Sequence, residues 1–190
     1  DNTGYTESEI EASKIVKYSA VIEQADNYGR LFLRMKIATD SGTDLAPLST
    51  DQLNAFTDYI KRVKDAGVKV QAESLPADLI RQQWRVYYDP LILGSTGSRI
   101  DGKAASPVHD AVKNYLKNLP FNGIYVPQYH TDEVQAVPGV VIAELDECEV
   151  KYGSMEYEQV QTKYTPDAGY LRFASDDDLS IEFIPLSPIK

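Results

Sequence analysis

The sequence has little of the chemistry on which enzymes and metalloproteins usually depend. Its 190 residues include a single cysteine, Cys148, and two histidines, His109 and His130. One cysteine excludes a disulfide within the chain, and the two histidines are too far apart for a zinc-binding helix motif. No apolar run approaches the roughly 18 residues of a membrane-spanning helix. We expect Cys148 to be a buried structural thiol in a strand.

Motifs that bind phosphate or activate a nucleophile are also missing. The segment Gly97–Ala104 (GSRIDGKA) follows the phosphate-loop spacing as far as Gly102 and Lys103, but Ala104 stands where a hydroxyl should reach Mg²⁺. We therefore interpret it as part of a turn-rich loop over residues 94–105. The sequence contains no Gly-x-Ser-x-Gly element and no Cys/His pairing.

The acidic turn Ser175–Asp178 does not have the alternating oxygens and closing Glu of a calcium loop. We predict no metal, no cofactor and no catalytic residue. One enzymatic alternative stays open, in which scattered carboxylates such as Asp89 and Asp101 converge and perform general acid–base chemistry.

Basic residues are scarce relative to acidic ones. Nineteen Lys and Arg against 29 Asp and Glu give a formal charge of −10 and a pI near 4.7. The densest basic cluster, Lys61, Arg62 and Lys64, is flanked by Asp58 and Asp65. Because nucleic-acid binding depends on cations that face phosphates, we predict no nucleic-acid partner.

The composition, with 43% hydrophobic and 25% charged residues, is that of an ordinary globular protein. A chain of this length forms one domain or two small ones and buries roughly 70% of its unfolded surface. It begins with Asp1 rather than Met, so the sequence leaves open whether residue 1 is a true terminus.

Hydrophobic periodicity and capping signals predict the elements of both halves of the chain. The strongest helix has a Ser49/Gln52 capping box and ends before Gly67. Another begins at Ser106 and Pro107 and ends at Pro120. Helices are expected at 6–17, 50–66, 106–119 and 128–136, and strands within 19–38 and at 68–72, 80–88, 140–150, 169–173 and 179–184.

This order predicts an α+β fold, with an antiparallel or mixed sheet and helices on one face. A ferredoxin-like βαββαβ order is expected over about 30–150, with an N-terminal helix and a C-terminal β-hairpin added. The predicted division is 1–28 as an N-terminal helix and strand, 29–150 as the α+β core, and 151–190 as the hairpin extension. Two lobes, 1–90 and 91–190, are the alternative.

Tyrosine is abundant, with 13 residues in the chain. Tyrosine combines a large apolar ring with a polar end and is enriched at protein interfaces. The second half supplies the candidate interface residues, which are Tyr125, Tyr129, Tyr152, Tyr157 and Tyr164. The alternative interpretation is that most of them lie at the boundary of the core.

The run from Pro107 to Gly123, PVHDAVKNYLKNLPFNG, resembles the C-terminal half of phage baseplate J-like proteins, which are wedge components of contractile tails. In that family, a helix that ends in a Leu-Pro step is followed by a second helix and by a Val-x-Gly-Val entry to a strand. Here that entry is Val137-Pro138-Gly139-Val140. The segments VYYDP at 86–90 and AGYL at 168–171 also sit where that family has a strand and a closing hairpin. The resemblance covers roughly 80–190.

This resemblance implies a structural component of a phage or prophage tail, or of a tail-like injection machine, in the baseplate. Such a protein acts through contacts with other baseplate or tail subunits and with copies of itself. It performs no catalysis, binds no membrane and has no small-molecule substrate. It would be found in the virion or tail-like particle, after assembly in the bacterial cytoplasm. A non-catalytic binding or adaptor module unrelated to tails is the alternative.

Overall fold

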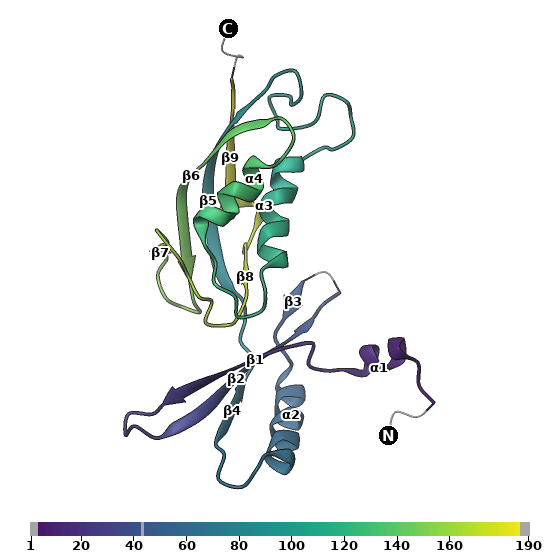
Figure 1. Cartoon of the computed structure of the whole chain (residues 1–190), viewed down its shortest axis with the longest axis vertical. Coiled ribbons are helices and arrows are strands. Elements are labelled where there is room, and N and C mark those ends of the chain that lie inside the picture. Colours follow the sequence, from purple (N-terminus) through teal and green to yellow (C-terminus); the bar gives the residue numbers. More distant parts are fainter. Residues whose placement is uncertain (1–3, 43, 187–190) are drawn as a thin grey trace. The chain divides into compact units, whose positions relative to one another are not determined.

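The computed structural model describes residues 4–42 and 44–186, and the chain divides into two compact units, Asp1–Ala77 and Asp78–Lys190 (Figure 1). Each unit is described by itself. The first contains α1 (Glu7–Ser13), β1 (Tyr18–Ala25), β2 (Leu31–Asp40), β3 (Leu45–Ala46), α2 (Thr50–Val63) and β4 (Val70–Glu73). The second contains β5 (Asp78–Tyr88), α3 (Pro107–Asn118), α4 (Pro127–Gln135), β6 (Val140–Lys151), β7 (Glu158–Gln159), β8 (Leu171–Arg172), the 3₁₀ helix η1 (Asp176–Asp178) and β9 (Leu179–Pro185).

The first unit is built around the β1–β2 hairpin. Its turn is closed by the Asp26 carboxylate, which accepts the backbone N–H groups of Tyr28 and Arg30, both at 2.9 Å. Gly29 adopts a φ of +76°, a conformation that favours glycine. β2 then pairs antiparallel with β1 and parallel with β4. The parallel pairing requires a crossover, which α2 supplies.

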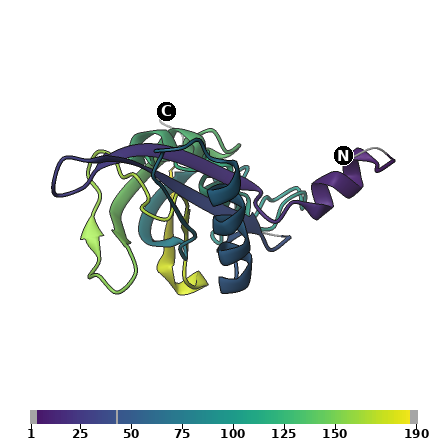
Figure 2. The ribbon, with the colours of Figure 1, turned by 90° about the horizontal axis from the view of Figure 1, so that it is seen from below.

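Helix α2 begins as its sequence predicts. The Ser49 hydroxyl accepts the N–H of Gln52 at 3.3 Å, and the Gln52 side chain accepts the N–H of Ser49 at 3.0 Å, which completes the capping box. α2 packs against β4, yet none of its residues is fully buried. Helix α1 stands apart from the strands of its unit in both views (Figures 1 and 2).

The sheet of the second unit is centred on β5, which pairs antiparallel with β6 and parallel with both β8 and β9. Even-numbered residues of β5, from Asp78 to Tyr88, are buried, whereas the residues between them are partly or fully exposed. This alternation places one face of the strand in the core and leaves the other open. Helices α3 and α4 cover the inner face (Figure 1).

Both helices of this unit have proline in the first turn, where the missing N–H costs nothing. Ser106 occupies the N-cap position of α3 as expected, but its side chain makes no capping hydrogen bond. The helix nevertheless forms, because Val108, Val112 and Leu116 lie on one face and are buried against the sheet. The helix predicted at 106–119 is therefore confirmed as α3.

The predicted α+β class is confirmed, but three finer expectations are wrong. The elements between 30 and 150 belong to two separate sheets, so they do not form one βαββαβ unit. The boundary between units lies at Ala77/Asp78. Neither the predicted three-part division nor the two-lobe alternative, divided at residue 90, has a boundary at that position. The reason is that β5 is a single continuous strand of the second sheet from its first residue.

The predicted C-terminal hairpin is the third correction. β8 and β9 do not pair with each other, since both run parallel to β5 and occupy successive parts of its edge. Ser175 and Asp178 form a capping box around η1 that keeps the chain running along this edge. Among the described helices, none is both long enough and apolar enough to cross a membrane.

Candidate functional site

The most concentrated polar chemistry of the second unit lies inside its core. Gln82 of β5, His130 of α4 and Cys148 of β6 meet Tyr125, which precedes α4. The Gln82 amide Nε2 donates to the Tyr125 hydroxyl at 2.7 Å and to His130 Nδ1 at 3.2 Å. The Tyr125 hydroxyl also lies 3.1 Å from His130 Nδ1. We call these four residues the core polar cluster.

The remaining contacts of the core polar cluster decide where its protons are. His130 Nε2 lies 3.2 Å from the carbonyl oxygen of Val112, which only accepts, so the ring proton belongs on Nε2. Nδ1 is then the acceptor for Tyr125 and Gln82. The Trp84 indole N–H donates to Gln82 Oε1 at 3.1 Å, and the Cys148 thiol donates to the Tyr125 oxygen at 3.6 Å.

Every member of the cluster is therefore bonded in its neutral form. Burial lowers the pKa of His130 to about 3, and it raises the pKa values of Tyr125 and Cys148 above their ordinary values. His130 also stacks on Tyr115 of α3, with ring centroids 4.3 Å apart. The arrangement joins β5, β6, α3 and α4, and it stabilises their packing.

A second buried polar group is Asp78, at the first position of β5. Its carboxylate accepts the Tyr164 hydroxyl and the backbone N–H groups of Asp167, at 2.7 Å, and Ala168, at 3.0 Å. Burial raises the pKa of Asp78, although these hydrogen bonds act in the opposite direction. The carboxylate holds the 164–168 segment against the strand and leaves no oxygen facing solvent.

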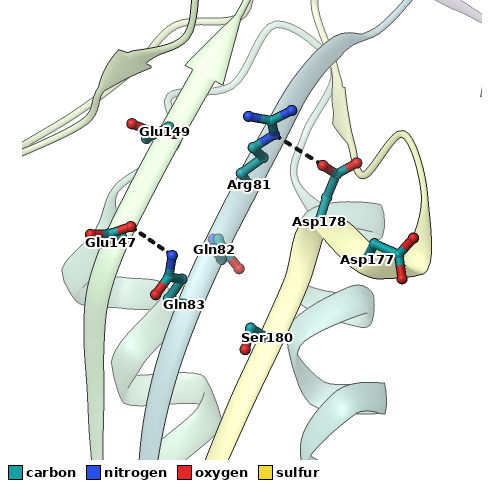
Figure 3. Close-up of a pocket in the computed structure, with 8 residues that line it drawn as sticks. All are labelled: Arg81, Gln82, Gln83, Glu147, Glu149, Asp177, Asp178 and Ser180. Atoms are coloured by element: carbon teal, nitrogen blue, oxygen red, sulfur yellow. Dashed lines mark hydrogen bonds and ion pairs between the residues drawn. The ribbon is translucent and has the colours of Figure 1, made fainter.

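The outer face of the same sheet carries four acidic side chains beside Arg81, which are Glu147, Glu149, Asp177 and Asp178 (Figure 3). A hollow of about 380 Å³ lies over β5, β6 and β9. Arg81 donates to Asp178 at 3.0 Å, and Gln83 donates to Glu147 at 2.7 Å. The lining is completed by Gln82, Glu149, Asp177 and Ser180.

A more apolar depression lies on the helical side, between α3 and α4. Its volume is about 420 Å³, and its lining includes Leu119, Pro120 and Ile124. Tyr129 of α4 and Ile124 leave 64% and 51% of their surface exposed at this place. Rings and aliphatic side chains exposed together beside Asn114 and Glu133 are typical of a protein contact surface.

The structure separates the five tyrosines predicted as interface residues. Tyr125 is withdrawn from that set, because its ring is fully buried in the core polar cluster. Tyr164 is half-buried and donates to Asp78. Tyr157 is half-buried under Arg81, whose guanidinium carbon lies 3.8 Å from the ring centroid. Tyr152 is half-buried too, and Tyr129 is exposed, so their interface role stays a prediction.

The carboxylates considered for catalysis are engaged in local contacts. Asp89 accepts the N–H of Leu91 at 2.9 Å, within a turn. Asp101 pairs with Arg99 at 2.7 Å, which holds the pKa of that carboxyl well below its usual range. The 97–104 segment is a loop, as expected. In residues 4–42 and 44–186, no group of three or more His, Cys, Asp or Glu side chains has the arrangement of a metal site.

Sequence reasoning missed the core polar cluster, although one signal was present. Gln82 interrupts an otherwise apolar set of inward residues on β5, between Ile80 and Trp84. A polar residue at such a position must find partners in the core. The sequence did not show that His130 and Cys148 would be among them, because they come from other elements.

A scan against models of known protein families returns no match for this chain, and a search of curated proteins finds no relative.

Proposed function

We propose that this protein is a structural subunit of the baseplate of a phage tail or tail-like injection machine, and that it acts through protein–protein contacts without catalysis. Its partners are other baseplate or tail subunits and further copies of the chain. The proposal joins the resemblance in residues 107–123 and 137–140 to the distribution of apolar surface on the folded chain.

The observation that carries the proposal is the incomplete burial of α2. This helix is amphipathic, with Leu53, Phe56 and Ile60 on one face, but it has no fully buried residue. Tyr59 and Val63 leave 59% and 55% of their surface exposed. An isolated globular protein usually buries the apolar stripe of such a helix, so exposed apolar surface on a well-formed helix favours a partner.

The depression between α3 and α4 gives a second, independent support. Tyr129 and Ile124 present apolar surface beside the amides of Asn114 and Asn118. Aromatic residues in a shallow apolar depression with a polar rim are the usual centre of an interface. By contrast, the core polar cluster is closed to solvent and neutral, and its contacts are those of a packed core.

Incorporation into particles tests the proposal. Tagged full-length chain is expressed in the source organism, tail-like particles are isolated by sedimentation, and the chain is quantified in that fraction by mass spectrometry. We expect the wild-type chain to co-sediment with tail proteins. Replacing both Tyr59 and Val63 by Ser should reduce its recovery in particles at least tenfold without unfolding the chain.

The matched control is Tyr28→Ser, which removes a ring with 85% of its surface exposed from the β1–β2 turn of the same unit. This variant should enter particles as the wild type does. A chain that is recovered only with soluble proteins, and never with tail proteins, contradicts the proposal and favours an adaptor module.

A further inference from the structure

Strand β9 lies at the margin of the second sheet (Figure 3). It pairs with β5 over all seven of its residues, Leu179–Pro185, and among the described residues β5 is its only partner strand. Long edge strands are usually protected by lysine, by a bulge or by a covering element, because their free backbone groups pair readily with another chain. β9 contains no lysine, and its proline is its last residue.

The direction of its free backbone groups follows from two hydrogen bonds. The N–H of Leu186 donates to the carbonyl of Tyr88 in β5 at 2.9 Å, so even-numbered residues of this segment face β5. The N–H of Leu179 instead bonds to Asp176, outside the β5 ladder. The N–H and C=O groups of Ile181 and Phe183 therefore point away from β5, toward the open edge.

The two faces beside this edge differ in chemistry. On the inner face, Ile181 and Phe183 are partly buried beside the core. On the outer face, Ser180 and Glu182 are exposed, close in sequence to the acidic η1 turn. Asp178 is paired with Arg81, whereas Asp177 and Glu182 form no ion pair in the described part of the chain. Arg85 is the register neighbour of Glu182 on β5, but its guanidinium pairs with Glu144 and Asp146.

We propose that the open edge of β9 binds an extended protein segment by strand addition, and that this segment alternates apolar residues with Lys or Arg. Its apolar side chains would cover Ile181 and Phe183, and its cations would lie beside Glu182 and Asp177. Opposite charges across neighbouring strands are stabilising and like charges are destabilising. A second copy of β9 is disfavoured, since it would bring two acidic faces together.

Strand addition at β9 rests on the proposed assembly role only because it supposes a protein partner. It uses a surface other than α2 and the α3–α4 depression, so each proposal can fail without the other. Loss of co-sedimentation with tails would refute the baseplate role. The peptide experiment below tests the edge alone, with the full-length chain.

The probe is a fluorescein-labelled nine-residue peptide that alternates Val and Lys, compared with a Val/Glu peptide by fluorescence anisotropy. We expect saturable binding of the Val/Lys peptide and at least tenfold weaker binding of the Val/Glu peptide. N-methylation of the alternate peptide amides that face β9 should abolish binding, whereas methylation of the other amides should not. Equal binding of both methylated peptides would overturn strand addition.

Two variants locate the site. Glu182→Lys should weaken binding of the Val/Lys peptide at least tenfold. Glu158→Lys changes the net charge equally but lies on β7, at the opposite edge of the sheet, so it should have less than a threefold effect. Amide exchange measured by NMR should slow at Ile181 and Phe183 when the peptide binds. Unchanged exchange there, or concentration-dependent dimerisation of the free chain through β9, would overturn the proposal.

Discussion

Of the 21 buried hydrophobic residues in the described part of the chain, 17 belong to residues 78–190. Only Ile37, Ala38, Leu48 and Ala77 belong to the first unit. Both units contain an amphipathic helix, yet α3 buries Val108, Val112 and Leu116 while α2 fully buries none. The hydrophobic period of a helix therefore tells which face turns inward, but the neighbouring elements decide how much of it is covered.

The physical reason is the number of elements that share each core. In the second unit, α3 and α4 pack together over β5 and β6, so each apolar side chain meets others from several directions. In the first unit, the one helix over the strands packs against β4. A single helix on a narrow sheet leaves part of its apolar stripe in solvent, and a partner subunit would stabilise it by covering that stripe.

The largest expected difference between the units comes from placing one carboxylate in each helix. Leu116→Asp puts an unpaired charge among Ile80, Tyr125 and Val150, and should cost about 4 kcal/mol of the free energy of unfolding. Ile60→Asp, in the half-covered α2, should cost about 1 kcal/mol, because water still reaches the carboxylate. Hydrogen exchange by mass spectrometry measures both units in one experiment.

Equal costs in the two helices would contradict the comparison. Denaturation of Leu116→Asp should also be visible in the emission of Trp84, the single tryptophan, which lies in the core of the second unit. Leu91→Asp is the control, since 78% of the Leu91 surface is exposed. Wild-type-like melting of Leu116→Asp would refute the placement of that residue.

Gly97→Ala tests how closely the loop after β5 is packed. Gly97 has a φ of +76°, and a Cβ there would overlap the Phe183 ring, so we expect a loss of about 3 kcal/mol from strain and overpacking. Gly102 has a similar φ of +72° but open space around it, and Gly102→Ala should cost about 1 kcal/mol. Urea denaturation followed by Trp84 emission gives both values, and equal losses would exclude tight packing on Phe183.

Acid should destabilise the second unit through His130. Its folded pKa of about 3 lies below the ordinary value, so the unfolded chain takes up the proton first, and stability that is present above about pH 6.5 is lost as pH falls toward 3. Between pH 7.5 and 5 this single group should remove about 2 kcal/mol. The effect of Asp78 on stability has the opposite sign. Because the pKa of Asp78 is raised, this group contributes to the free energy of unfolding at lower pH.

The measurement is urea denaturation at several pH values, followed by Trp84 emission. His130→Asn removes the titrating ring and keeps an acceptor for Tyr125, so its stability should vary less over the same interval. A wild-type protein whose unfolding free energy is constant between pH 7.5 and 5 would show that His130 is not buried in neutral form.

The smallest expected effect is that of Tyr129→Ala. Because 64% of the Tyr129 surface is exposed, the change in unfolding free energy should stay within about 0.5 kcal/mol. Tyr125→Ala, four residues earlier and fully buried, should cost about 4 kcal/mol. Differential scanning calorimetry compares them directly, and a loss of several degrees in Tyr129→Ala would place that ring in the core.

Local signals along the chain were sufficient for most of the elements. The Ser49/Gln52 capping box and Pro107 at the start of α3 each act within a few residues, and each was predicted from the sequence. The strand predicted at 80–88 also lies within β5.

What the amino-acid sequence determines here is the set of helices and strands, the inward face of each, and an acidic chain with few groups suited to catalysis. Only the tertiary structure decides that β8 and β9 both lie parallel to β5, that the sheets are two, and that Tyr125 is buried with His130. These features depend on pairings between residues up to about a hundred positions apart, such as Arg81 with Asp178. Capping and periodicity act over single turns, whereas strand pairing is selected by the packing of the whole unit.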